Sequence, residues 1–143
     1  MRSLLDVNVW IALFDDAHQF SEQANAFINT PGVSIATCPM IENGVMRIMS
    51  MPAYGRSGGL PIGMVRQQLK MACSAIDHAF WADDISLRDD DLIDIDRVQG
   101  HQQITDLYLL ALAVHHGGRL VTFDQGVALK SVRAAQLDNL LVL

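Results

Sequence analysis

The strongest constraint on the fold is the opening segment Leu4-Leu5-Asp6-Val7-Asn8, in which an apolar pair runs into an aspartate and a longer apolar run follows soon after. The pattern predicts a short buried strand that ends at Asp6 and a helix that begins directly after it. Asp6 is therefore expected at the carboxyl end of a strand, which is the edge where open α/β sheets bind ligands. A carboxylate surrounded by so much apolar sequence needs a partner, because burying an unpaired charge is costly.

Short apolar segments alternate with helical segments along the rest of the chain. The sequence predicts strands at 2–5, 33–37, 80–81, 119–123 and 139–143. It predicts helices at 8–14, from 18 or 21 up to a stop at 30–32, at 39–51, at 61–76 and at 104–116. A loop rich in Gly and Pro covers 52–61, and 83–96 is acidic. The alternation predicts an α/β fold, a three-layer α/β/α arrangement around a central, mainly parallel sheet. The 143 residues fit one domain spanning 1–143.

Composition narrows the class of protein. The formal net charge of −6 disfavours a protein that coats nucleic acid by bulk attraction, but it does not exclude an enzyme that holds a polyanion through metal ions. Cys38 and Cys73 lie far apart in the sequence and lack the spacing of metal ligands. We expect both to be small buried thiols in a reducing cytoplasm. No signal-peptide pattern precedes Asp6, and no apolar run reaches the ~18 residues of a membrane span. We therefore expect a cytoplasmic protein without a membrane segment.

Four acidic residues are expected along one edge of the predicted sheet. Asp6 and Asp124 follow predicted strands, whereas Glu42 and Asp106 open predicted helices, with Thr105 as the expected N-cap before Asp106. Each acid on its own has a structural explanation, such as a favourable position at a helix N-terminus or the start of a turn. Because strand C-termini and helix N-termini share an edge in a parallel sheet, the four together predict a converging site.

A converging set of carboxylates predicts a divalent cation, because like charges at close range resist joint ionisation. Mg²⁺ or Mn²⁺ prefers oxygen ligands, and no set of His and Cys in the sequence suits zinc. A bound cation of this kind lowers the pKa of a water molecule and neutralises phosphate charge. The chemistry that follows is hydrolysis of a phosphodiester by metal-activated water.

These residues resemble a known family. Asp6-Val7-Asn8, Glu42 after the second strand, Thr105-Asp106 before an Ala/Leu-rich helix, and Thr122-Phe123-Asp124 together resemble a PIN-domain nuclease. The length and the opening strand are most similar to the VapC toxins of bacterial toxin–antitoxin pairs. The resemblance covers essentially the whole chain, and its specificity lies in the order and spacing of the four fragments.

The resemblance implies a role for each matching residue. Asp6 and Asp106 match the principal metal-binding acids, Glu42 and Asp124 match the two further catalytic acids, and Asn8 matches a small polar residue that supports Asp6 by hydrogen bonding. It also implies an Mg²⁺- or Mn²⁺-dependent endoribonuclease that acts on RNA, forms a homodimer and is neutralised by a VapB-type antitoxin.

Basic residues gather in one part of the sequence. The span 43–76 contains no acid, and it carries the four cations Arg47, Arg56, Arg66 and Lys70. These residues are candidates for contact with RNA phosphates or with an acidic antitoxin, since Arg suits bidentate phosphate contacts. The alternative is an ordinary solvated pair of helices. The adjacent His115 and His116 are interpreted as a favourable positive charge at a helix C-terminus rather than as metal ligands.

Other functions remain open at this point. A PIN-like nuclease with a housekeeping role in RNA or DNA processing would carry a similar site. A Mg²⁺-dependent phospho-receiver or a haloacid-dehalogenase-like phosphatase would also use carboxylates on a parallel sheet. Both of the latter favour a second acid near the first strand, where this chain has Asn8. An interaction module without activity would be free to lose acids that are present here.

Overall fold

A computed structural model describes residues 1–143. The strands are β1 (Ser3–Leu5), β2 (Ser34–Thr37), β3 (Asp77–Phe80), β4 (Arg119–Thr122) and β5 (Leu140–Val142). The helices are α1 (Val7–Phe14), α2 (Ser21–Ile28), α3 (Pro39–Met49), α4 (Ile62–Ala75) and α5 (Ile104–His115). Short 3₁₀ turns lie at Ile95–Arg97, His101–Gln103, Leu129–Ser131 and Leu137–Asn139.

The strands form one five-stranded sheet in the order β3-β2-β1-β4-β5, and every neighbouring pair is parallel. The central strand β1 pairs with β2 on one side and with β4 on the other. The strand order therefore reverses next to β1, and ligands in open α/β sheets bind at the carboxyl ends of the strands beside such a reversal. The sequence prediction of a parallel α/β fold is confirmed.

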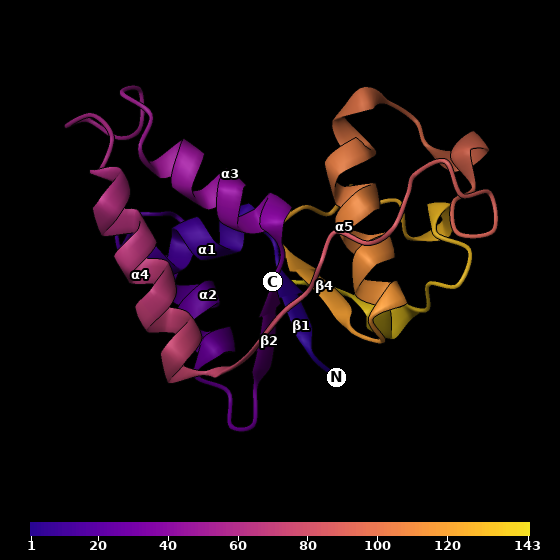
Figure 1. The fold of residues 1–143 in the computed structure, drawn as a ribbon, viewed down its shortest axis with the longest axis horizontal. Helices are drawn as coiled ribbons and strands as arrows, with labels where there is room; N and C mark the ends of the chain where they lie inside the picture. The colour runs from indigo at the N-terminus through magenta and orange to yellow at the C-terminus, as the bar shows by residue number, and fades with distance from the viewer.

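Helices cover both faces of the sheet, which gives three layers (Figure 1). Helices α1 to α4 lie to the left of the sheet in the figure, and α5 lies to the right with the later turns. One cluster of 28 buried apolar residues forms the core. Leu4, Leu5 and Trp10 from the opening segment are fully buried in it, together with most of α5. The burial of β1 explains why the successive residues Leu4 and Leu5 are both apolar instead of alternating with polar residues.

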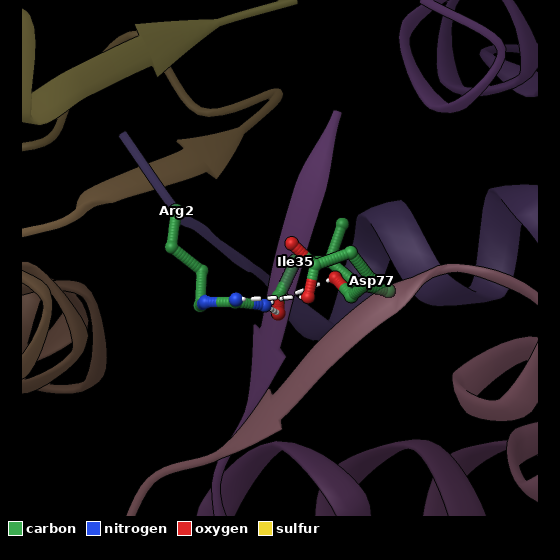
Figure 2. A network of polar contacts seen from close by, with 3 residues as sticks. All are labelled: Arg2, Ile35 and Asp77. Carbon is green, nitrogen blue, oxygen red and sulfur yellow. Dashed lines mark hydrogen bonds and ion pairs between the residues drawn. The ribbon is translucent and has the colours of Figure 1, made fainter. Parts of the chain in front are cut away.

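An arginine joins the amino ends of three strands (Figure 2). Arg2 donates from Nη1 to the carbonyl oxygens of Ile35 and Asp77 at 2.8 and 3.0 Å, and from Nη2 to Asp77 Oδ1 at 2.9 Å. Arg2 precedes β1, Ile35 belongs to β2 and Asp77 begins β3. This contact therefore fixes the register of three strands at the edge opposite the acidic residues.

Two details of the sequence prediction are wrong. The third strand covers Asp77–Phe80 instead of residues 80–81. It is an edge strand with one neighbour, and no residue in it is fully buried, so its sequence lacks an apolar signal. Helix α5 begins at Ile104 with Gln103 at the N-cap, because the 3₁₀ turn at His101–Gln103 leads directly into it. Thr105 therefore lies inside the first turn and does not cap the helix.

The other expected elements are confirmed to within one or two residues. None of the helices is both long enough and apolar enough to cross a membrane.

Candidate active site

Asp6 lies between β1 and α1 and is 7% exposed. Its Oδ1 accepts a hydrogen bond from the backbone N–H of Val7 at 2.6 Å, which caps α1. Its Oδ2 accepts a hydrogen bond from the Thr122 hydroxyl at 2.9 Å. Burial raises the pKa of the Asp6 carboxyl, the two hydrogen bonds oppose that rise, and the negative charge of Asp124 adds to it. The side chain is thus held in one orientation at the carboxyl end of the central strand.

Asp106 and Asp124 approach Asp6 from the other side of the strand-order reversal. Asp106 is in the first turn of α5, and Asp124 follows β4 by two residues. Burial raises the pKa of Asp106 to about 6, and the negative charges of Asp6 and Asp124 contribute to the rise. Three carboxylates that are distant in the sequence therefore influence one another electrostatically.

The three aspartates line a cavity of about 710 Å³. The residues around it come from the starts of α1 and α5, from most of the length of α3, and from the segments after β3 and β4. Its polar and charged lining consists of Asp6, Asn8, Asn43, Arg47, Asp83, Thr105, Asp106 and Asp124. Four carboxylates face one arginine, so the cavity carries an excess of negative charge.

Glu42 is not among the residues that line this cavity. Its Oε1 accepts a hydrogen bond from the Thr37 hydroxyl at 2.8 Å, and the Thr37 oxygen lies 2.8 Å from Nε2 of His78. Because the hydroxyl donates to Glu42, Nε2 of His78 is the donor to Thr37. The negative charge of Glu42 also acts on Cys73 in α4. The structure thus brings together three of the four predicted acids and directs the fourth toward β3 and α4.

Asn8 and Thr105 lie in the cavity lining, and both are exposed. The resemblance implied that Asn8 supports Asp6 by a hydrogen bond. The structure differs, because Asn8 makes no hydrogen bond to Asp6. The hydroxyl of Thr122 and the N–H of Val7 occupy the two carboxylate oxygens instead.

Two further polar residues of this region were missed by sequence reasoning. Thr122 is fully buried at the end of β4, and its hydroxyl donates to Asp6 and accepts from the N–H of Asp124 at 3.1 Å. Asp83 lines the cavity, and its Oδ2 accepts from the N–H of Met40 at 3.1 Å in the first turn of α3. The segment Thr122-Phe123-Asp124 could have indicated Thr122, because the threonine lies at the end of the strand that leads to Asp124. Asp83 was missed because the third strand was predicted in the wrong place, and Asp83 follows the true end of β3 by three residues.

The four basic candidates separate into two places. Arg47 lines the cavity from α3, on the same helical face as Asn43. Arg56 lies in the loop before α4, and Arg66 and Lys70 lie on α4. Arg56, Arg66 and Lys70 are exposed and are not part of the cavity lining. Only Arg47 is therefore positioned to contact a group bound beside the aspartates.

The donor chemistry of the cavity fits a hard divalent cation. Asp6, Asp106 and Asp124 form no salt bridge with any Lys, Arg or His. Burial raises the pKa of Asp6 and of Asp106, and negative charge from neighbouring aspartates adds to both rises, a repulsion that a cation would relieve. All of these donors are oxygens, the ligand type that Mg²⁺ and Mn²⁺ prefer.

Comparison with known proteins identifies the family of the chain. The sequence matches the PIN domain family over residues 3–133. It is 40% identical over 144 residues to Ribonuclease VapC44 of Mycobacterium tuberculosis, with all of both chains covered. It is 39% identical to Ribonuclease VapC39 of the same organism over 90% of this chain and 92% of the relative, and 39% identical to Ribonuclease VapC38 over 87% and 86%. The chain therefore belongs to the PIN domain family, in the branch that contains the VapC ribonucleases.

Proposed function

We propose that this protein is the toxin of a toxin–antitoxin pair and acts as a metal-dependent endoribonuclease that hydrolyses RNA phosphodiester bonds. The main support is that Asp6, Asp106 and Asp124 meet in one cavity and form no salt bridge with a basic residue. Relatives of the chain are named ribonucleases. Phosphodiester hydrolysis needs a way to hold a polyanion at an acidic site, and a divalent cation provides it.

In this proposal Asp6 and Asp106 hold Mg²⁺, with Mn²⁺ as an alternative, and Asp124 completes the acidic wall of the cavity. When bound, such an ion neutralises charge on the scissile phosphate and lowers the pKa of a water molecule. The Thr122 hydroxyl keeps the Asp6 carboxylate in its orientation, and the Arg47 guanidinium offers a bidentate contact to the phosphate. Asn8 and Thr105 supply polar contacts at the rim of the cavity.

Glu42 stays in the proposal as a supporting acid, since it belongs to the helix that carries Arg47 and Asn43. Its hydrogen bond with Thr37 ties the start of α3 to the end of β2. We expect Glu42→Gln to reduce cleavage less than Asp6→Asn, because Gln keeps an oxygen that accepts from Thr37.

The direct test compares RNA cleavage with Mg²⁺, with Mn²⁺ and with EDTA, using protein freed of any antitoxin. Asp6→Asn and Asp106→Asn should remove cleavage while thermal unfolding still shows a folded protein. Cleavage that survives EDTA, or equal cleavage by the wild type and both variants, would rule out the metal nuclease. Growth arrest on expression that a neighbouring gene relieves would separate a toxin from a housekeeping nuclease.

The proposal includes a homodimer in the cytoplasm and neutralisation by a VapB-type antitoxin. Support comes from α4, where Ile62, Met64 and Met71 are each more than half exposed beside the cations Arg66 and Lys70. Exposed apolar side chains with positive charge nearby suit an acidic protein partner. Light scattering coupled to size-exclusion chromatography measures the mass of the free protein, and a monomer at micromolar concentration would contradict the dimer.

A further inference from the structure

We propose a second metal site, for Zn²⁺, formed by Asp84, His115 and His116 on the side of the molecule that carries α5. This proposal replaces the sequence interpretation of the two histidines as a positive charge at the helix end, which did not include Asp84. The site is separate from the cavity of aspartates and goes beyond the nuclease activity proposed above. Two imidazoles and a carboxylate are ligands that zinc accepts readily, whereas Mg²⁺ prefers oxygen ligands alone. The two sites are therefore expected to select different ions.

The three donor atoms converge, although the residues come from two segments. Oδ1 of Asp84 lies 3.1 Å from Nε2 of His116 and 3.8 Å from Nε2 of His115. All three ligand atoms lie within 4.8 Å of one another. Ligands of a tetrahedral zinc are about 3.3 Å apart when the metal–ligand distance is about 2.0 Å. Small side-chain rotations are thus enough to close the three atoms around one ion, and a water molecule can take the fourth position.

The end of α5 explains how two adjacent histidines can face one carboxylate. His115 is the last residue of the helix, and His116 is its C-cap. Gly117 adopts a left-handed φ of 66°, and the N–H groups of Gly117 and Gly118 return to the carbonyls of Val114 and Ala113. Such a turn fixes the backbone at the helix end. The two rings then meet edge to face with centroids 5.1 Å apart.

Trp81 holds one of the ligands in place. The ring of His116 stacks on the indole with centroids 4.7 Å apart and an angle of 9° between the planes. Trp81 itself is 8% exposed, and a Cβ at Gly118 would lie 2.6 Å from its ring. The absence of a side chain at Gly118 therefore leaves the space that the indole occupies. A ligand fixed by its neighbours loses little freedom when it binds a metal, which favours binding.

A zinc ion at this position would join the segment after β3 to the end of α5. Asp84 follows Asp83, which lines the acidic cavity and accepts from the N–H of Met40 at the start of α3. The site would thus fasten a segment that contributes one wall of the cavity without placing zinc in that cavity.

The test measures Zn²⁺ binding to the full chain in the Asp106→Asn background, which weakens the acidic cavity as a competing site. A chromophoric chelator competes for the ion, and saturating Mg²⁺ is present. The background protein should bind one Zn²⁺. Asp84→Asn, His115→Ala and His116→Phe should each weaken binding at least tenfold, and Phe keeps the ring that stacks on Trp81.

His101→Ala is the matched control, because His101 is an exposed histidine outside the cluster. It should leave Zn²⁺ binding unchanged. Co²⁺ gives a second measurement, since the intensity of its visible absorption reports four-coordinate geometry and should be lost in the same three variants. No stoichiometric Zn²⁺ binding, or binding that Asp84→Asn, His115→Ala and His116→Phe leave unchanged, would overturn the proposal.

Discussion

At the residue scale, the orientation of the site depends on Thr122. Its buried hydroxyl is the only side-chain donor to Asp6, and the same oxygen accepts from the N–H of Asp124. One side chain therefore links two of the three acids and sets the geometry between β1 and the segment after β4. Because the Asp6 carboxylate is already held in one orientation, it loses little side-chain conformational entropy when it binds a cation.

Thr122→Val is expected to lower cleavage about tenfold or more, because the removed hydrogen bond to a charged group is worth about 1.5–3 kcal/mol. Val has the same β-branched shape as Thr, so the substitution should preserve the packing of this strand position. Thr122→Ser is the matched control, since it keeps the hydroxyl, and it should retain most of the activity. Initial rates with a labelled RNA at saturating Mg²⁺ provide the measurement. Equal rates for the Val and Ser variants would show that the hydroxyl plays no part in the site.

The same scale shows what the sequence could not predict. Asp6, Asp106 and Asp124 were predicted because each follows or opens an element at the carboxyl edge of a parallel sheet. The direction of the Glu42 side chain could not be predicted. The position of a residue in a helix fixes where its Cβ lies but not which neighbour its carboxylate contacts. The Thr37 hydroxyl donates to Glu42, and His78 in turn contacts Thr37. Thr37 and His78 belong to neighbouring strands whose register is visible only in the folded sheet.

At the element scale, α1 and α3 meet closely at the base of the cavity. A Cβ added to Gly44 of α3 would lie 2.7 Å from Cγ2 of Val7, the first residue of α1. Val7 also donates the backbone hydrogen bond to Asp6. The contact between these helices therefore bears directly on the acid that begins the site.

Gly44→Ala is expected to reduce cleavage and to lower the free energy of unfolding, because the added methyl group displaces Val7. Alanine in an open helical position has the opposite effect and stabilises by about 0.5–1 kcal/mol. Gly63→Ala in α4 is the matched control, since nothing lies within 4 Å of the added Cβ. Urea denaturation compares the two variants. A stabilised and fully active Gly44→Ala protein would show that α1 and α3 separate at no cost.

The order of elements was predictable because most of them carry strong periodic or apolar signals, α5 above all. The third strand was not, because β3 pairs only with β2 and is partly exposed, so no apolar pattern marks it. That error also concealed Asp83, since the rule that finds acids after strands needs the end of the strand in the right place. The pairing of Asp84 with His115 and His116 could not be predicted either, because it depends on how the segment after β3 crosses to α5.

At the scale of the whole molecule, the acidic cavity opposes folding in the absence of metal. The pKa of Asp106 is raised to about 6 from an ordinary value of 3.8, and burial raises that of Asp6 as well. A raised folded-state pKa means that the native protein binds the proton more tightly than the unfolded chain. The stability that protonated Asp106 contributes is complete below about pH 4 and is lost as the pH rises through about 6.

The Asp106→Asn variant in EDTA should therefore be more stable than the wild type at pH 7.5, even though it should be inactive. Solvent screening of this half-buried group limits the gain to about 1 kcal/mol, which corresponds to a rise in Tm of about 2–4 °C for a chain of this size. The difference should shrink at pH 4.5, where the wild-type carboxyl is protonated. Mg²⁺ should raise the Tm of the wild type at pH 7.5 more than that of the variant, because the variant keeps only the repulsion between Asp6 and Asp124. Differential scanning calorimetry of both proteins at the two pH values, with EDTA and with Mg²⁺, measures these Tm values. A variant that unfolds below the wild-type temperature in EDTA at pH 7.5 would show that Asp106 stabilises the fold, and the acids would then need a partner within the protein itself.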